Sequence, residues 1–329
     1  MTDTREIVDE IVKTKSHVIK EFLDKLGKIK IEPVDIEKLE KQEQEQFKIK
    51  TGTIIDEMIG GGVPEGKSVM LYGEFGSGKT QTCFTTVCLA KGYIIYIDTE
   101  GSFSCQRLKQ ICESRKIDWN DVKKRIILYT AENWIQQMYI LQSLPSPSDV
   151  NGKVDLIICD SYSKHFRGIE FVGRETLQLK NGFIREFIFS LERLAKQHRA
   201  ALIYTTQIYD EPKASPYATK ADTQKPVGGH SAEHQPDFIL FFRRGTGNVR
   251  IVRMVDSSYT ALSERAFLIT EKGIEDLPPD TKISKTLEPQ IEKFETKQHQ
   301  EEIKIKKKEK SQDQENKDSE EEIVDEAVM

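Results

Sequence analysis

Eight consecutive residues in the first third of the chain have types and spacing suited to holding a phosphate chain. The run Gly73-Glu74-Phe75-Gly76-Ser77-Gly78-Lys79-Thr80 fits G-x-x-x-x-G-K-[ST] and lies between an apolar run and a helix-length segment. Its glycines let successive backbone N–H groups turn toward one anion, and a helix beginning there adds partial positive charge. Lys79 would reach the β- and γ-phosphates, and the Thr80 hydroxyl would hold Mg²⁺. The sequence therefore predicts a site for ATP and Mg²⁺.

Three polar residues end or follow apolar runs elsewhere in the chain. Asp160 ends VDLIICD, Glu100 follows YIIYID, and Gln207 ends ALIYTTQ. Ligands of α/β proteins bind at the carboxyl ends of parallel strands. We expect Asp160 to complete the Mg²⁺ site, Glu100 to activate the attacking water and Gln207 to sense the γ-phosphate; general-base help is typically worth ~10²–10⁴-fold. The alternatives are a cap for the next element at Asp160 and a surface loop acid at Glu100.

Short β-rich runs alternate with helix-length segments between Phe47 and about Leu277. Apolar strands separated by helices predict an α/β fold with a mainly parallel twisted sheet and helices on both faces. Three further runs lack long helices between them and are expected as antiparallel or edge additions. The strand runs are 69–73, 93–98, 126–130, 154–160 and 201–207, the helical segments 79–91, 104–116, 132–144 and 176–198, and the additions 238–242, 249–255 and 266–270.

The chain of 329 residues divides into three zones by composition. Residues 1–46 hold an amphipathic helical pattern over 4–26 followed by a polar linker, residues 47–277 form the predicted core, and residues 278–329 are charged and almost without aromatics. Such a segment buries too little apolar surface to order itself, so 278–329 is expected to be disordered, with transient helix as the alternative within 281–329. Residues 281–329 carry 10 Lys and 14 acidic residues, which leaves 1–280 close to neutral. Any DNA contact must therefore come from a local patch.

The five cysteines contain no C-x-x-C pair and lie in apolar or helical stretches. That pattern is typical of a reduced cytosolic interior. No run approaches the ~18 apolar residues that a membrane span needs, and the acidic N-terminus lacks the apolar core of a signal peptide. The sequence predicts a cytoplasmic protein with no membrane association.

Six segments, in their order and spacing, resemble the core of the archaeal RadA recombinase family of the RecA superfamily. The resemblance covers about residues 47–277 and implies a RecA-type P-loop ATPase core. The matching segments are YGEFGSGKTQ, YIDTEGSF, CDSYSKHFRGIEFVGRETL, TTQI, KPVGGHSAEH and FLITEKGIEDL.

The resemblance implies further nucleotide contacts beyond the eight-residue loop. Gln81 belongs to the matched loop segment, and Arg107 matches an arginine that packs on the adenine, although Cys105 replaces the family's usual proline. His234 matches a histidine that senses the γ-phosphate across a subunit interface. Asp256 matches an acid that caps the ATP of the neighbouring subunit, with Ser258 where the family commonly has proline.

The same resemblance implies two loops that bind DNA. Phe166 to Thr176 matches the first, in which Arg167 and Arg174 would contact phosphates, a task suited to the bidentate guanidinium. Residues 208–229 match the second. The second loop contains Lys213, Lys220, Lys225, Gly228 and Gly229. The alternative for the two arginines is exposed, solubilising charge.

Two histidines offer a different interpretation of the region after the second loop. His230 and His234 are spaced i, i+4, a spacing that zinc sites on helices use. No third ligand accompanies them in the sequence, so zinc stays a minor alternative.

Two features of the family are missing from the N-terminal part of this sequence. Residues 1–46 show no glycine-rich hairpins of a helix-hairpin-helix domain, and residues 1–60 contain no Phe-x-x-Ala subunit-docking peptide. We therefore expect a RadA/RadB-like paralogue that lacks the extra domain.

The predicted function is ATP-dependent binding of single-stranded DNA in homologous recombination and DNA repair, with DNA-dependent ATPase activity. The alternative is an ATP-binding mediator that regulates a cognate RadA with little turnover. A more remote alternative is a KaiC-like or helicase-like ATPase of the same fold. The expected partners are single-stranded DNA, and a second copy of this chain or a cognate RadA.

Overall fold

The computed structural model describes residues 33–167, 174–210, 223–229, 232 and 234–278. The chain divides into two units, residues 1–46 and 47–329. In the first unit, α2 (Ile36–Gln44) begins at Asp35, whose carboxylate accepts a hydrogen bond from the Glu37 N–H at 3.0 Å. The helical pattern expected over 4–26 and the charged tail beyond 278 lie outside the described residues. The three-zone division stays a prediction.

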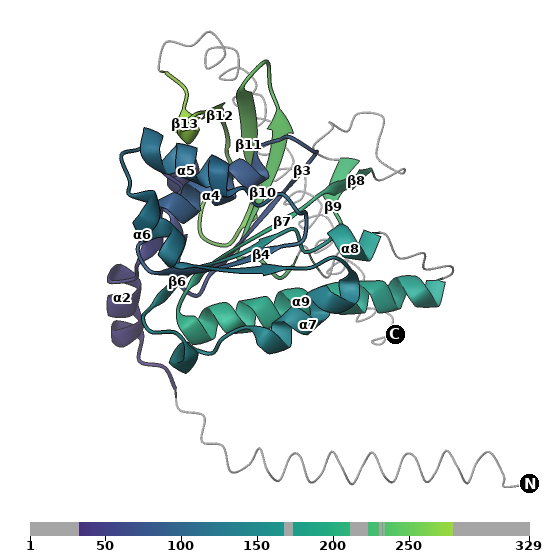
Figure 1. Cartoon of the computed structure of the whole chain (residues 1–329). Coiled ribbons are helices and arrows are strands. Elements are labelled where there is room, and N and C mark those ends of the chain that lie inside the picture. Colours follow the sequence, from purple (N-terminus) through teal and green to yellow (C-terminus); the bar gives the residue numbers. More distant parts are fainter. Residues whose placement is uncertain (1–32, 168–173, 211–222, 230–231, 233, 279–329) are drawn as a thin grey trace, which may run out of the picture. The chain divides into compact units, whose positions relative to one another are not determined.

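A nine-stranded sheet forms the centre of the second unit (Figure 1), in the order β13-β12-β11-β10-β3-β7-β6-β4-β5. The strands β10, β3, β7, β6, β4 and β5 run parallel, and β11, β12 and β13 are antiparallel additions. The predicted fold class is confirmed. The bounds are β3 (Ser68–Gly73), β4 (Tyr93–Asp98), β5 (Ile126–Thr130), β6 (Val154–Asp160), β7 (Ala201–Thr206), β10 (Phe238–Arg244), β11 (Val249–Ser257), β12 (Glu264–Thr270) and β13 (Gly273–Asp276).

Strand β10 corrects one expectation. The run 238–242 was expected to be an antiparallel or edge strand, but it lies inside the sheet and pairs in parallel with β3. Its first five residues are buried. Both faces of β10 are therefore covered, and that burial accounts for the unbroken apolar run.

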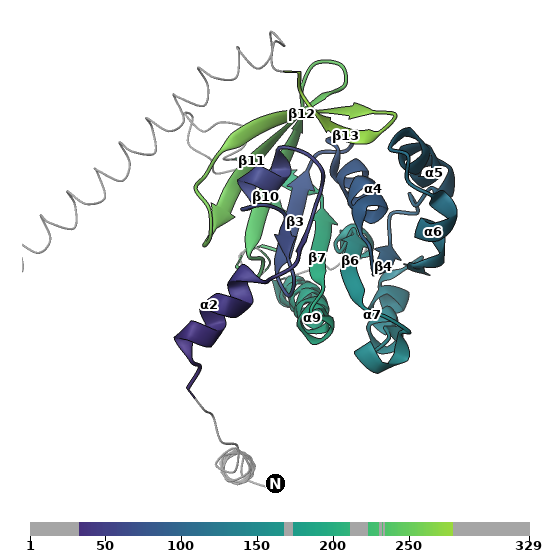
Figure 2. The same ribbon diagram turned by 90° about the vertical axis from the view of Figure 1, so that its left-hand side faces the viewer.

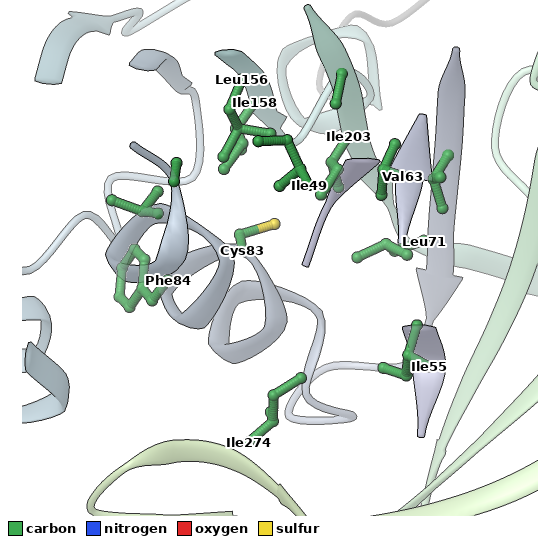
Figure 3. Packing of buried hydrophobic residues seen from close by; sticks show 14 of the residues in the cluster. Ile49, Ile55, Val63, Leu71, Cys83, Phe84, Leu156, Ile158, Ile203 and Ile274 are labelled. Carbon is green, nitrogen blue, oxygen red and sulfur yellow. The ribbon is translucent and has the colours of Figure 1, made fainter. Parts of the chain in front are cut away.

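Helices cover both faces of the sheet (Figures 1 and 2). One face carries α4 (Lys79–Leu89), α5 (Cys105–Ser114) and α6 (Trp119–Lys124), and the other carries α7 (Trp134–Ser143) and α9 (Arg174–His198). Alternate side chains of one strand enter different cores: Leu71 belongs to the cluster that contains Cys83 and Phe84 of α4 (Figure 3), whereas Tyr72 belongs to the cluster on the opposite face. This double burial fixes β3, and with it the loop between β3 and α4.

Short elements complete the unit. The helix α8 (Lys164–Arg167) follows β6, and a two-stranded ribbon lies at the end of β7. None of the described helices is long and apolar enough to cross a membrane. The remaining elements are β1 (Lys48–Ile49), α3 (Ile55–Met58), β2 (Val63–Pro64), η1 (Pro147–Asp149), β8 (Ile208–Asp210) and β9 (Gln224–Pro226).

Candidate functional site

The phosphate-binding loop leaves the end of β3 and turns directly into α4. Gly78 begins α4 with a φ of 108°, a left-handed conformation that glycine adopts without strain. Gly73 has no room for a side chain, because a Cβ there would overlap the carbonyl oxygen of Phe242 on β10. The close approach of β10 therefore requires glycine at this position of the motif.

Lys79 turns its ammonium into the loop. Its Nζ donates hydrogen bonds to the carbonyl oxygens of Gly73 at 2.7 Å and Glu74 at 3.0 Å. Burial lowers the pKa of Lys79 to about 8, although the negative charges of Asp160 and Glu100 oppose that shift. The site therefore holds a cation that is poorly solvated and would gain strongly from an anionic phosphate.

Asp160 lies fully enclosed at the end of β6. Its Oδ2 accepts from the Thr80 hydroxyl at 2.7 Å, and its Oδ1 accepts from Thr205 at 2.5 Å. Desolvation raises the pKa of the Asp160 carboxyl, and the two hydroxyl donors counteract that rise. A buried carboxylate of this kind is favoured by a nearby cation.

Thr80 and Asp160 fit Mg²⁺ by their chemistry, because hydroxyl and carboxylate oxygens are the hard ligands that this ion prefers. No cluster of three or more His, Cys, Asp or Glu side chains able to hold a metal occurs among the described residues. Mg²⁺ commonly relies on few protein ligands and takes the others from water and substrate phosphates. The residue set therefore suits a metal that arrives with a nucleotide.

Glu100 follows β4 and faces the segment after β6. Its Oε1 accepts from the Ser161 hydroxyl at 2.6 Å, and its main-chain carbonyl accepts from Lys164 Nζ at 2.7 Å. Asp98 fixes the same turn from the other side, since its carboxylate accepts from the N–H groups of Gly101 and Phe103 at 2.9 and 3.0 Å. The carboxylate of Glu100 is thus held at the wall of the site.

Gln207 lies just beyond β7. Its amide oxygen accepts a short hydrogen bond from the Arg167 guanidinium. Arg167 was predicted to contact DNA, and its side chain is exposed. The structure brings this arginine to the predicted γ-phosphate sensor.

Arg107 on α5 spans the gap between α4 and β12. Its Nε donates to the Gln81 side chain at 2.8 Å, and its Nη2 donates to the Thr270 carbonyl at 2.5 Å. Partial burial lowers the pKa of this guanidinium, which stays charged near neutral pH. Arg107 therefore connects the phosphate-loop helix to the antiparallel part of the sheet.

A cavity of about 590 Å³ joins most of the predicted nucleotide residues. A volume of this size is typical of small-molecule sites. Gly73 and Glu74 support Lys79 from outside the lining, and Asp256 and His234 are exposed and do not line it. The predicted residues in its wall are Phe75, Gly76, Ser77, Gly78, Lys79, Thr80, Gln81, Glu100, Arg107, Asp160 and Gln207.

Arg250 on β11 also lines this cavity, and sequence analysis missed it. Its Nε donates to the Gly76 carbonyl at 2.8 Å. The residue lies in an ordinary strand run, VRIVRMV, that carries no motif. Only the pairing of β11 with β10, and of β10 with β3, brings Arg250 to the loop.

The predicted DNA loops are described only in part. Lys213, Lys220 and His230 lie outside the described residues, and of Arg174 only its place at the start of α9 is described. Lys225 is half-buried on β9. Gly228 has a φ of 120°, and a Cβ there would lie 2.8 Å from the Ala232 Cβ, whereas Gly229 is more open. The DNA roles of all these residues stay predictions.

The sheet order and the loop between β3 and α4 define a P-loop protein with a RecA-type core. The chain belongs to the Rad51 family, whose model matches residues 42–277. The resemblance stated from the sequence is thereby confirmed.

Named relatives support this assignment. The chain is 35% identical to the DNA repair and recombination protein RadA of Aeropyrum pernix, over 70% of this chain and 73% of that protein. It is 32% identical to the protein of the same name from Metallosphaera sedula, over 80% and 82%. It is also 32% identical to the meiotic recombination protein DMC1 of Saccharomyces cerevisiae, over 71% and 72%.

Proposed function

We propose that this chain is an ATP-dependent, single-stranded-DNA-binding protein of homologous recombination and DNA repair, acting in the cytoplasm. The printed names of its RadA and DMC1 relatives support the recombination role. Support for the nucleotide comes from the cavity, in which a phosphate-binding loop, a buried lysine, two acids and a glutamine converge.

Each residue then has a distinct task. The loop N–H groups and the Lys79 ammonium bind the β- and γ-phosphates, and Arg107 packs beside the adenine. Thr80 and Asp160 would hold Mg²⁺, which when bound would neutralise charge on the phosphate oxygens. Glu100 accepts the proton of the attacking water, and Gln207 senses whether the γ-phosphate is present.

One observation carries the proposal: Lys79 and Glu100 line the same cavity although they come from different strand ends. A carboxylate that faces the same cavity as Lys79 can accept the proton of a water beside the γ-phosphate. The cost of holding a carboxylate near a buried one, Asp160, is offset when a metal and a nucleotide are bound.

The test compares ATP binding and hydrolysis in two variants and a control. Glu100→Gln keeps the shape of the side chain and removes its basicity, so we expect retained ATP binding with hydrolysis reduced by ~10²-fold or more. Lys79→Ala removes the phosphate cation, so ATP binding itself should collapse. Glu132→Gln, an exposed acid outside the cavity, is the matched control. Wild-type turnover by Glu100→Gln would rule out this base.

Oligomeric state distinguishes the recombinase from the mediator. Sedimentation with ATP and single-stranded DNA should give filaments for an active recombinase. A chain that stays monomeric alone and sediments in a complex with a cognate RadA would instead support the mediator role. That role needs little ATP turnover. His234 and Asp256 do not line the cavity of their own subunit, so their predicted role requires an assembly in which they reach the nucleotide of a neighbouring subunit.

A further inference from the structure

The short helix α8 is attached to several strand ends at once. Ser163, just before it, accepts a hydrogen bond from the Thr206 hydroxyl at 2.8 Å. His165 Nε2 lies 2.8 Å from the Ala131 carbonyl after β5, and the Phe166 ring packs edge-on against Phe187 of α9. Because these contacts leave α8 little freedom, a side chain that projects from it is well positioned.

Lys164 on α8 is the side chain that reaches the proposed base. Glu100 is held by three hydrogen bonds, all from the segment that runs from the end of β6 into α8. Its N–H donates to the Asp160 carbonyl at 3.2 Å, its carboxylate accepts from Ser161, and its carbonyl accepts from Lys164 Nζ at 2.7 Å. Of these three contacts, only the bond from Lys164 comes from α8 itself, and its donor is a charged ammonium.

The Lys164 ammonium bonds to the backbone of Glu100 and not to its carboxylate. Within the described residues it makes no ion pair with a carboxylate, and it donates to the main-chain carbonyl of Glu100. Lys164 is half-buried and does not line the cavity. Its contact therefore acts on the backbone of the turn at Glu100 and not on a ligand.

We propose that Lys164 is a positioning residue for Glu100, which sets the orientation of the Glu100 carboxylate by fixing its peptide carbonyl to α8. This inference rests on the proposed role of Glu100 as the base of ATP hydrolysis. Small displacements of a reacting group can cost up to ~10²-fold in rate. Loss of the Lys164 contact should consequently lower kcat while leaving ATP affinity unchanged.

The experiment measures kcat and KM for ATP, and the Kd for ATP separately, in the full chain. Lys164→Met keeps the length of the side chain and removes the donor, so we expect kcat to fall roughly tenfold or more with an unchanged Kd. Lys164→Arg restores a charged donor and should recover most of the rate. Lys109→Met, an exposed lysine on α5 paired with Glu113, is the matched control and should behave as wild type.

A double variant separates positioning from general weakening of the fold. If Lys164 acts through Glu100, adding Lys164→Met to Glu100→Gln should cause no further loss of kcat. A full multiplicative loss in the double variant, an unchanged kcat in Lys164→Met, or loss of ATP binding in that variant would each overturn the inference. Equal turnover by Glu100→Gln and wild type would instead overturn the proposed base, a result that the Lys164 series cannot mimic.

Discussion

Lys79 is a cation held away from water, and its burial sets the pH range in which it can bind a phosphate chain. Its pKa of about 8 means that about half of the free protein has lost this charge at pH 8. Bound phosphates favour the charged form, so ATP affinity should be constant below about pH 7 and fall as the pH rises through 8. We expect roughly tenfold weaker binding near pH 9 than near pH 7, measured by equilibrium titration with ATP.

The control for this prediction is Lys79→Arg, whose guanidinium stays charged throughout the same range. Its absolute affinity will differ from wild type, but its profile should be flat between about pH 7 and 9. A wild-type profile that is equally flat would show that Lys79 keeps its proton and that burial does not control it.

At the residue scale, the spacing of residues predicted those parts of the site that depend on neighbouring positions in the chain. Lys79 and Thr80 could be predicted because they are adjacent in one motif. Glu100 and Asp160 could be predicted because each follows or ends an apolar run. Arg250 and Lys164 could not be predicted in this way. Arg250 contacts Gly76, and Lys164 contacts Glu100, across long stretches of chain. Such contacts depend on which strands become neighbours.

At the element scale, α9 places the acid Glu192 against β3 and β7. Glu192 accepts hydrogen bonds from Ser68 at 3.1 Å and Tyr204 at 3.4 Å. Burial raises the pKa of Glu192 to about 7, with a smaller contribution from the charge of Asp237 and with the hydroxyl donors acting against it. Glu192 therefore opposes the folded state once it ionises.

The sign of the pH effect follows from the two pKa values. Between about pH 4.5 and pH 7 the folded chain holds more protons at Glu192 than the unfolded chain, so stability falls as the pH rises through that window. Glu192→Gln should raise the free energy of unfolding by about 1 kcal/mol near pH 8, a value reduced for solvent screening because the side chain is only partly buried. The melting temperature of Glu192→Gln near pH 8 should be roughly 2–4 °C above that of the wild type.

Near pH 5 the same substitution should have a much smaller effect, because Glu192 is then protonated in the folded state. Glu186→Gln, on the same helix but exposed, is the control. A stabilisation of equal size at both pH values would indicate a packing effect of the amide and would contradict the role of ionisation.

Strand pairing also marks the limit of sequence-based prediction for elements. The apolar run of β10 indicates burial, but it does not indicate that β3 is its parallel partner. The order of the strands is set by packing between distant segments, and periodicity carries no information about it. The helices α4, α5, α7 and α9 could be placed because each fills a helix-length segment between two apolar strand runs.

At the scale of the whole molecule, charge limits how this chain can bind DNA. The formal net charge is −5, so no general basic surface attracts a nucleic acid. Binding must rest on a few local cations, of which Arg167 is the described candidate beside the cavity. Its guanidinium is bonded to Gln207, so an arginine proposed for DNA and a glutamine proposed for the γ-phosphate share one contact.

The salt dependence of DNA binding tests whether Arg167 contacts a DNA phosphate. If three to five phosphates are contacted per subunit, the slope of log K against log salt should be roughly −2 to −3.5, at about −0.7 per phosphate for single strands. Arg167→Ala should weaken binding and flatten the slope by about 0.7, because one released counterion is lost. Arg193→Ala, which removes an equal charge from the exposed side of α9, should leave the slope unchanged. An unchanged slope in Arg167→Ala would place the DNA contact elsewhere, and equal flattening by both variants would show that only net charge matters.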